Sequence, residues 1–368
     1  MRIALVTEFY YPHLGGVTEH VHHLGRELRQ RGHEVTIITS HMTGERVDPS
    51  SVRRLGTSRV IYSNGSFARI TTGWRLTHRI AGVLREVGAD LVHCQDVLAP
   101  TLGLVASTAA WRLGLPIVAT FHSWFPRSAG YRVFRHPLQR RLDRVAAKIA
   151  VSEPVVRALS RYFAADWELI PNGVDITMFH PDGRQPTDYH VRGPRLLFLG
   201  RLDPRNGLDT VLAAMPRILA RYPATELIVA GDGPLRPVYE RRARTLGGRV
   251  RFLGQVNGER PQMYGTADLY LCPTTKASFG ITLLEAMACG TPLVVSDIIG
   301  FRELVTDGAE AVLVTKDDAA AWADAVVDLI GDPDRRAAMG RAGHAKAADY
   351  AWPRVADRIL AVYERVLA

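Results

Sequence analysis

"LYLCPTTKASFGITLLEAMACGTPLVVSD", residues 269–297, contains the structural unit that recurs along the chain. A short apolar run, 269–273, is followed by a segment of helical character and then by a second apolar run, 292–297. Short runs that are apolar throughout are typical of strands in a parallel sheet covered by helices on both faces. The stretch therefore predicts a strand, a helix and a second, parallel strand.

The same rhythm continues in both directions from this stretch. In the first half, strands are expected at 3–7, 35–39, 90–94, 116–121 and 148–152. In the second half, strands are expected at 195–201, 226–231, 250–256, 269–273, 292–297 and 311–315. Between the halves, residues 171–194 are rich in proline, glycine and aspartate, as in an interdomain linker. The prediction is an α/β chain of two Rossmann-like, doubly wound domains, facing a cleft lined by the carboxyl ends of both sheets.

Composition is that of an ordinary globular protein. The chain has 368 residues, 47% of them hydrophobic and 23% charged, which suits two α/β domains. No apolar run reaches the roughly 20 residues of a bilayer-spanning helix, and the start of the chain resembles a first strand more than a signal peptide. Cys94, Cys272 and Cys289 are far apart, which argues against a disulfide framework or a zinc site. We expect a cytoplasmic protein.

The formal net charge of +9 suits nucleic acid, an anionic membrane or a phosphorylated substrate. No RNA-binding aromatic motif, zinc-finger spacing or helix-turn-helix pattern is present, so no nucleic-acid partner is expected. Residues 126–148 carry seven basic side chains and one acid, with Tyr131 and Phe134 between them. Such a surface suits peripheral contact with an anionic membrane, and a merely solvated basic helix is the alternative. The apolar stripe in 74–87 is expected to pack against a sheet.

Two loops at strand ends are suited to bind anions. Gly15 and Gly16 lie between a strand and a helix, where the backbone can approach a ligand at the positive end of the helix. The alternative is a glycine turn without a ligand, and the motif is neither a dinucleotide fingerprint nor a P-loop. Arg201 ends the strand at 195–201 and carries a fixed positive charge that would suit a diphosphate.

The helical segment after residue 277 offers a further anion site. Ser278 is expected near the helix start. The amides expected to face an anion are those of Phe279, Gly280 and Ile281. Glu285 lies about two turns further along, within "LLEAMA". A lone buried glutamate is costly, which favours a hydrogen-bonding role such as holding ribose hydroxyls.

Metal binding is not expected from the acidic and histidine motifs. Asp332-Pro333-Asp334 resembles a metal motif, but aspartate before proline is typical of a helix start, with Asp332 as the cap. The histidines of the first helix, His20, His22 and His23, are expected to be packed or solvated, not to chelate a metal. No metal and no cofactor are predicted.

Motifs along nearly the whole chain carry a family resemblance. They are the Gly15-Gly16 loop, "IPNGVD" at 170–175, "GRLDP" at 200–204, "GDGPLR" at 231–236, "ADLYLCPT" at 267–274 and "FGITLLEAMACGTPLVVSD" at 279–297. Together they resemble a retaining glycosyltransferase of the GT-B architecture, family 4. The stretches 61–70, 90–96 and 116–125 resemble the phosphatidylinositol mannosyltransferases within that family.

The resemblance implies a role for each matching position. Residues 1–170 would form an acceptor-side domain with the C-terminal helix, about 352–368, packed back on it, and 195–351 would bind the nucleotide-sugar donor. Gly16 and Arg201 would contact the donor diphosphate, His122 the donor sugar, the amides of 279–281 the distal phosphate, and Glu285 the ribose. Residues implied to face an inositol phosphate headgroup are Tyr10, Asn64, Ser66 and Arg69. The alternatives to these roles are that Asn64-Gly65-Ser66 forms only a turn and that His122 is only a histidine at the end of a strand.

The donor side departs from the family pattern at two positions. The family's Glu-x7-Glu has Ala277 at its first position, and Asn206, beside Arg205, replaces a lysine before glycine. We expect an active enzyme with an altered contact to the donor sugar, because stabilisation of the leaving diphosphate does not depend on that carboxylate. Mannose from GDP-mannose, moved to a phosphatidylinositol-like or other lipid or polyol acceptor, is the leading hypothesis. A UDP-sugar-dependent transferase, and a catalytically silent relative that binds nucleotide or membrane, are the alternatives.

Overall fold

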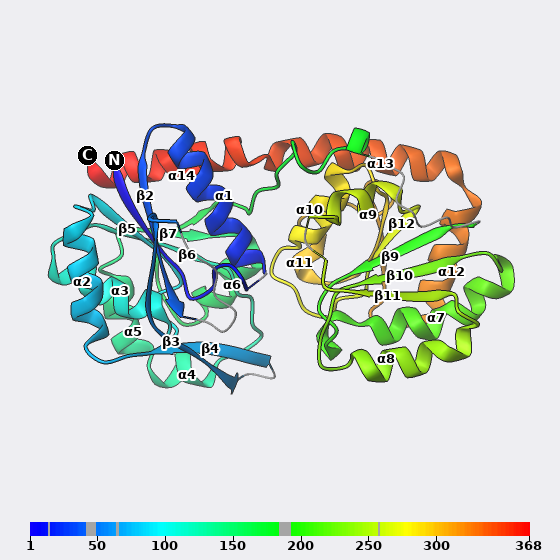
Figure 1. Cartoon of the computed structure of the whole chain (residues 1–368), viewed down its shortest axis with the longest axis horizontal. Helices are drawn as coiled ribbons and strands as arrows, with labels where there is room; N and C mark the ends of the chain where they lie inside the picture. Colours follow the sequence, from blue (N-terminus) through cyan, green and yellow to red (C-terminus); the bar gives the residue numbers. More distant parts are fainter. Residues whose placement is uncertain (14, 42–48, 64–65, 184–192, 257) are drawn as a thin grey trace. The chain divides into compact units, whose positions relative to one another are not determined.

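The computed structural model describes residues 1–13, 15–41, 49–63, 66–183, 193–256 and 258–368 (Figure 1). The chain divides into two compact units. Unit 1 consists of Met1–Gly173 and Trp352–Ala368, and unit 2 consists of Val174–Ala351. Each unit is built on one largely parallel sheet with helices on both faces, which confirms the predicted fold class.

Unit 1 contains an eight-stranded sheet in the order β4-β3-β2-β1-β5-β6-β7-β8. The strands are β1 (Arg2–Val6), β2 (Glu34–His41), β3 (Val52–Ser63), β4 (Ser66–Thr72), β5 (Leu91–Gln95), β6 (Ile117–Phe121), β7 (Ala147–Ala150) and β8 (Trp167–Leu169). All neighbouring pairs are parallel except β3 and β4, which pair antiparallel with Ser63 opposite Ser66. The strand order reverses between β1 and β5, so the carboxyl ends of these two strands mark a ligand-binding position of doubly wound sheets.

The helices of unit 1 cover this sheet. They are α1 (Gly16–Gln30), α2 (Leu76–Glu86), α3 (Leu102–Arg112), α4 (Ala129–Val133), α5 (Arg135–Leu142), α6 (Glu153–Ser160) and α14 (Trp352–Leu367). The helix α1 buries Val21, Leu24 and Leu28, and Gly32 follows its end with φ of 83°. A residue with this backbone conformation is most easily a glycine, as expected for a helix stop.

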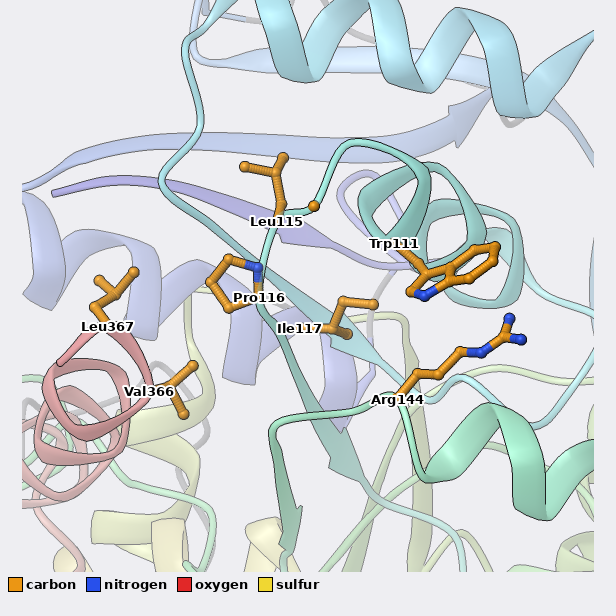
Figure 2. A pocket seen from close by; sticks show the side chains of 8 residues that line it. Trp111, Leu115, Pro116, Ile117, Arg144, Val366 and Leu367 are labelled. Carbon is orange, nitrogen blue, oxygen red and sulfur yellow. The ribbon is translucent and has the colours of Figure 1, made fainter.

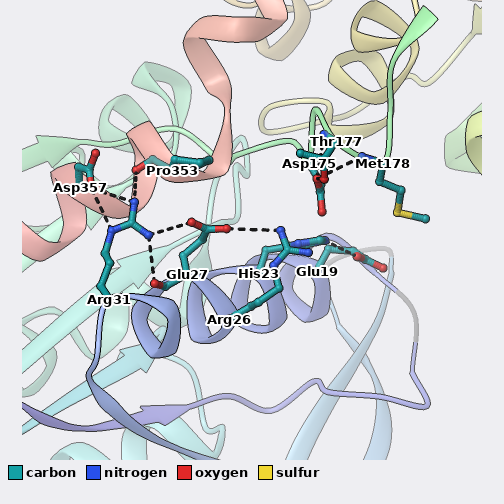
Figure 3. A network of polar contacts seen from close by, with 10 residues as sticks. All are labelled: Glu19, His23, Arg26, Glu27, Arg31, Asp175, Thr177, Met178, Pro353 and Asp357. Atoms are coloured by element: carbon teal, nitrogen blue, oxygen red, sulfur yellow. Dashed lines mark hydrogen bonds and ion pairs between the residues drawn. The ribbon is translucent and has the colours of Figure 1, made fainter. Parts of the chain in front are cut away.

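The C-terminal helix α14 is fastened to α1 by both apolar and charged contacts. Trp352, Val355 and Ile359 belong to the same buried cluster as Leu24 and Leu28 of α1. At the edge of this contact, Arg31 donates hydrogen bonds to Glu27 at 2.8 Å and to Asp357 at 2.9 Å (Figure 3). The last helix of the chain is therefore an integral part of unit 1.

The apolar stripe of 74–87 packs inward as expected. Leu76, Ile80 and Leu84 of α2 are buried, whereas Trp74 just before the helix is 85% exposed. Each strand expected from the sequence overlaps an observed strand, but β3, β4 and β8 were not expected. The first two lie at one edge of the sheet and β8, with three residues, at the other.

Unit 2 contains a six-stranded, wholly parallel sheet in the order β11-β10-β9-β12-β13-β14. The strands are β9 (Arg195–Leu199), β10 (Glu226–Ala230), β11 (Val250–Gly254), β12 (Leu269–Cys272), β13 (Leu293–Ser296) and β14 (Ala311–Val314). The helices are α7 (Leu208–Arg221), α8 (Arg236–Ala243), α9 (Arg260–Thr266), α10 (Ile281–Ala288), α11 (Ile299–Arg302), α12 (Ala319–Gly331) and α13 (Pro333–Ala347). Short 3-10 helices are η1 (Pro181–Gly183), η2 (Pro204–Asn206), η3 (Arg244–Leu246) and η4 (Ala348–Tyr350).

The strand order of unit 2 reverses between β9 and β12. The carboxyl ends of these strands lead into the loops that carry Arg201 and Ala277, so the sheet brings two distant motifs to one place. Within the described ranges, every helix is too short or too polar to traverse a bilayer.

Candidate functional site

The loops after β9 and β12 are joined by hydrogen bonds. Asn206 donates from Nδ2 to the carbonyl of Arg201 at 2.7 Å, and the amide of Thr275 donates to the carbonyl of Arg205 at 2.8 Å. Gly207 has φ of 70°, and a Cβ there would lie 2.1 Å from the carbonyl oxygen of Pro273. Asn206, which stands where the family pattern has lysine, therefore braces the loop after β9.

The side chains at these loops make a positively charged edge. The side chain of Arg201 is 53% exposed, with Nε 3.9 Å from Asp203 Oδ2, at the limit of an ion pair. Arg205 and Lys276 are exposed, and within the described part of the chain neither forms an ion pair. Cations at the carboxyl ends of β9 and β12 give this edge of unit 2 an affinity for anions.

The helix α10 begins later than the sequence suggested. Its first residue is Ile281 and its N-cap is Gly280, with φ of 109° and no side-chain cap. Ser278 lies near the helix start, as expected, but it does not cap the helix, because Gly280 adopts a left-handed conformation that redirects the chain at that point. Phe279 lies before the helix and is buried, and Ala277 is partly exposed. The amides of Gly280 and Ile281 remain at the helix start, where an anion would bind.

Glu285 is held by two partners that the sequence did not reveal. Its carboxylate, 3% exposed, accepts hydrogen bonds from Arg260 Nη1 at 2.7 Å and from the Tyr264 hydroxyl at 3.0 Å. Burial, and then the charge of Glu285, raise the pKa of Tyr264 well above its usual value, so this hydroxyl stays protonated and donates. Arg260 and Tyr264 thus hold the Glu285 carboxylate in a fixed position inside unit 2, where their hydrogen bonds compensate for its loss of solvation.

In unit 1, Gly15 and Gly16 form the exposed start of α1. Gly15 is the N-cap, in extended conformation, and makes no side-chain cap. Among the described residues other than its chain neighbours, a Cβ at Gly15 would meet only His13 Nε2, at 3.9 Å. The first amides of this 15-residue helix are thus available to an anion.

His122 follows β6 and lies in a group of buried polar side chains. Its Nε2 lies 2.6 Å from Gln95 Oε1 at the end of β5, and its ring centroid lies 4.8 Å from that of His20. Burial lowers the pKa of His122 well below its usual value. His122 is therefore a neutral imidazole near pH 7, able to make hydrogen bonds but not to carry charge.

The four residues implied to face an acceptor differ in their surroundings. Tyr10 is buried, with its hydroxyl 3.3 Å from His22 Nδ1. Arg69 lies on β4 opposite Val60 and is partly exposed, and Ser66 begins the same strand. Asn64 lies outside the described residues. Their acceptor role stays a prediction.

The hairpin of β3 and β4 is tied to the rest of unit 1 through Glu8, another residue that the sequence reasoning missed. Glu8 lies just after β1 and is 2% exposed. Its carboxylate accepts hydrogen bonds from Ser58 at 2.9 Å, from Thr71 and from the amide of Leu102 at 3.0 Å. The sequence did contain a signal for Glu8, because an acidic residue just after a buried strand is a candidate functional or structural site. For Arg260, Tyr264 and Gln95 no such local signal exists.

The basic segment 126–148 is only partly free. Arg141 donates to Thr108 Oγ1 at 2.7 Å, and the guanidinium of Arg144 lies 3.9 Å from the ring centroid of Trp111. Trp111 and Arg144 line a pocket with Ile117, at the amino end of β6 (Figure 2). That edge of the sheet is opposite the carboxyl ends that carry the candidate site residues, so the pocket is not part of the site.

Two further side-chain groups have structural roles. Asp332 Oδ1 accepts a hydrogen bond from the amide of Arg335 at 2.9 Å, and Pro333 opens α13, which confirms the helix-start interpretation. His20 and His23 are packed within unit 1. Across the described residues, no group of three or more His, Cys, Asp or Glu side chains is arranged to hold a metal ion.

Comparison with solved structures defines the class of fold. HepE of Anabaena, crystallised with UDP and glucose, superimposes with a TM-score of 0.79 at 21% sequence identity, over 99% of this chain and all of that one. This likeness establishes the GT-B glycosyltransferase fold.

Sequence comparison makes the assignment more specific. Residues 14–178 match the family described as Glycosyltransferase Family 4, and residues 193–332 match Glycosyl transferases group 1. The phosphatidyl-myo-inositol mannosyltransferase of Mycolicibacterium smegmatis is 36% identical over 100% of this chain and 94% of its own length. The protein of that name from Mycobacterium tuberculosis is 34% identical over 100% of this chain and 97% of its own. The chain belongs to glycosyltransferase family 4 and resembles the phosphatidylinositol mannosyltransferases within it.

Proposed function

We propose that this glycosyltransferase moves mannose from GDP-mannose to the inositol ring of a phosphatidylinositol-like lipid, with retention of anomeric configuration. The observation that carries the proposal is full-length similarity to two proteins named phosphatidyl-myo-inositol mannosyltransferase, at 36% and 34% identity. The cationic loops and open helix starts of the two units suit the phosphates of such substrates.

Unit 2 is assigned the donor nucleotide. Arg201 and the amides of Gly280 and Ile281 contact the diphosphate, and Glu285 accepts hydrogen bonds from the ribose hydroxyls. Support comes from the exposed guanidinium of Arg201 at the carboxyl end of β9. Arg201 and the two amides act where negative charge develops, which is the most effective place for electrostatic stabilisation.

Unit 1 is assigned the acceptor and the donor sugar. Arg69 and Ser66, with Tyr10 and Asn64, bind the inositol phosphate, Gly16 approaches the donor diphosphate, and His122 contacts the donor sugar. The support is the open start of α1 and the depressed pKa of His122, which leaves a neutral hydrogen-bonding group for a sugar hydroxyl.

The reaction exchanges one C–O bond for another. The bond between the anomeric carbon and the diphosphate oxygen breaks, and its electron pair remains on the diphosphate, where Arg201 stabilises it. An inositol hydroxyl oxygen attacks the anomeric carbon from the same face, and its proton passes to the departing diphosphate. No carboxylate nucleophile is needed at position 277, so Ala277 is compatible with turnover.

Contact with an anionic membrane would bring the enzyme to its lipid acceptor. Trp74 is 85% exposed, and Val133 and Phe134 are 70% and 58% exposed between exposed Arg132 and Arg135. Aromatic and basic side chains together suit the headgroup region of a bilayer. The double variant Arg132→Glu/Arg135→Glu should sediment less with vesicles containing phosphatidylinositol, whereas Arg341→Glu on α13 should behave as the wild type. Equal sedimentation of both would refute this contact.

A donor and acceptor panel tests the function. The purified protein is incubated with GDP-mannose or UDP-sugars and with phosphatidylinositol vesicles, and the lipid product is identified by mass spectrometry. We expect a mass increase of one hexose only with GDP-mannose, and an α-linkage by NMR. Transfer from a UDP-sugar would replace the donor assignment, and a β-linked product would refute retention.

A further inference from the structure

The imidazole of His122 is positioned by a side chain from a neighbouring strand. Gln95 is the last residue of β5 and is 4% exposed, and its Oε1 lies 2.6 Å from His122 Nε2. In this orientation of the Gln95 amide its oxygen faces the ring, and because an amide oxygen only accepts a hydrogen bond, Nε2 of His122 would carry the proton. The other ring nitrogen, Nδ1, then bears the lone pair and can accept a hydrogen bond.

The ring of His122 is also held from a second side. His20 of α1 is 1% exposed and meets His122 edge-on, with ring planes at 79° and centroids 4.8 Å apart. His20 is itself anchored, since its Nδ1 donates to Asn172 Oδ1 at 3.0 Å and its ring packs 5.3 Å from that of Trp352. Turning the imidazole of His122 would require His20 to leave a closely packed position.

Among the described residues, none is shown to stabilise a protonated ring of His122 by its charge. The titratable groups acting on it are His20 and His93, and burial lowers their pKa values to about 4 and about 3. His93 is hydrogen-bonded to Tyr363 at 2.6 Å and to Thr120 at 2.7 Å, and is wholly buried. All three rings are therefore neutral near pH 7, and hydrogen bonding alone decides the tautomer.

We propose that Gln95 is a positioning residue that fixes His122 as the Nε2–H tautomer, so that Nδ1 accepts a hydrogen bond from a substrate hydroxyl. The inference rests on the proposed glycosyl transfer only for the identity of that hydroxyl, which belongs to the donor sugar. On this assignment His122 neither donates a proton to the leaving diphosphate nor carries charge. It orients the sugar by accepting a hydrogen bond.

The tautomer is read directly in the ligand-free protein by NMR of ¹⁵N-histidine-labelled samples, with His122→Ala identifying the signal. We expect a protonated Nε2 and an unprotonated Nδ1 in the wild type, and a mixture of tautomers in Gln95→Met, which has a similar shape but no acceptor. Gln95→Glu keeps an acceptor and should keep the Nε2–H form. Gln139→Met on the surface helix α5 is the control and should leave the signal unchanged.

Activity supplies a second readout. Loss of one neutral hydrogen bond should lower kcat/KM of Gln95→Met about tenfold. Gln95→Glu should regain part of the lost kcat/KM. The acidic limb of its pH profile should move towards neutrality, because a carboxylate raises the pKa of the His122 ring. An Nδ1–H tautomer in the wild type, or an unchanged tautomer in Gln95→Met, would overturn the proposal. If the tautomers are as expected but the wild type transfers no sugar, the proposed function fails and the assignment for Gln95 stands.

Discussion

Arg260→Ala should destabilise unit 2 because it leaves the Glu285 carboxylate buried without its cation. In the intact protein the two groups are 2.7 Å apart, and the side chains of Arg260 and Glu285 are 17% and 4% exposed. Removing one partner of a buried ion pair costs about 3–5 kcal/mol. Tyr264 still donates to the carboxylate, and water can reach the vacated position from the more exposed side. We therefore expect a loss near the lower limit, about 3 kcal/mol.

Urea unfolding followed by tryptophan fluorescence measures this loss. With a slope of about 2 kcal/mol per molar urea, the midpoint of the transition of unit 2 should fall by about 1.5 M. Arg236→Ala is the control, since Arg236 also forms a 2.7 Å ion pair in unit 2, with Glu240, but both side chains are much more exposed. This variant should leave the midpoint almost unchanged. Equal midpoints for the two variants would refute the claim that Glu285 is held as a buried carboxylate.

Three further outcomes follow from the structure. The free energy of unfolding should fall as pH drops below about 6.5, by about 2 kcal/mol at pH 5 for each of His20 and His93. The cause is that these histidines take up protons in the unfolded chain, whereas burial lowers their pKa values in the folded protein to about 4 and about 3. An unchanged melting temperature between pH 7 and pH 5 would contradict this. Ala277→Glu should alter KM and donor preference of an enzyme that is already active. Asn206→Lys should loosen the loop after β9, because it removes the hydrogen bond from Asn206 to the carbonyl of Arg201. Turnover that appears only in the double variant would show that the wild type is catalytically silent. Sugar transfer should persist in a chelator, because the proposed role of Arg201 and the helix amides is to neutralise the diphosphate. Activity restored specifically by Mn²⁺ or Mg²⁺ would contradict that assignment.

The alternation of strands and helices was predictable because both sheets are mostly parallel and buried on two faces. Runs such as 3–6 and 293–295 are apolar throughout, and that pattern does not depend on distant contacts. The hairpin of β3 and β4 was missed because it lies at a sheet edge, where Val52–Ser63 carries polar side chains that a buried strand would not tolerate. An Asn-Gly pair between two extended runs was the hairpin signal in the sequence.

The candidate site was predictable only where a motif is local. Arg201 and Gly16 lie directly after a strand or before a helix, so sequence alone suggests their position. The partners of Glu285 are 21 and 25 residues away, on α9, and only tertiary packing brings them to α10. The displaced helix start at Gly280 had a different cause, because serine is a common cap and the sequence does not show that glycine takes the left-handed position.

The proposed transfer of sugar requires that Arg201 stabilise the leaving diphosphate. The most direct measurement is the rate of GDP release from GDP-mannose, with and without phosphatidylinositol vesicles, for the wild type, Arg201→Ala and the control Arg221→Ala at the end of α7. We predict release that depends on the lipid in the wild type and the control, and a fall of about 100-fold in Arg201→Ala. Release that is independent of the lipid would refute transfer to the lipid, and equal rates in all three proteins would refute the role of Arg201.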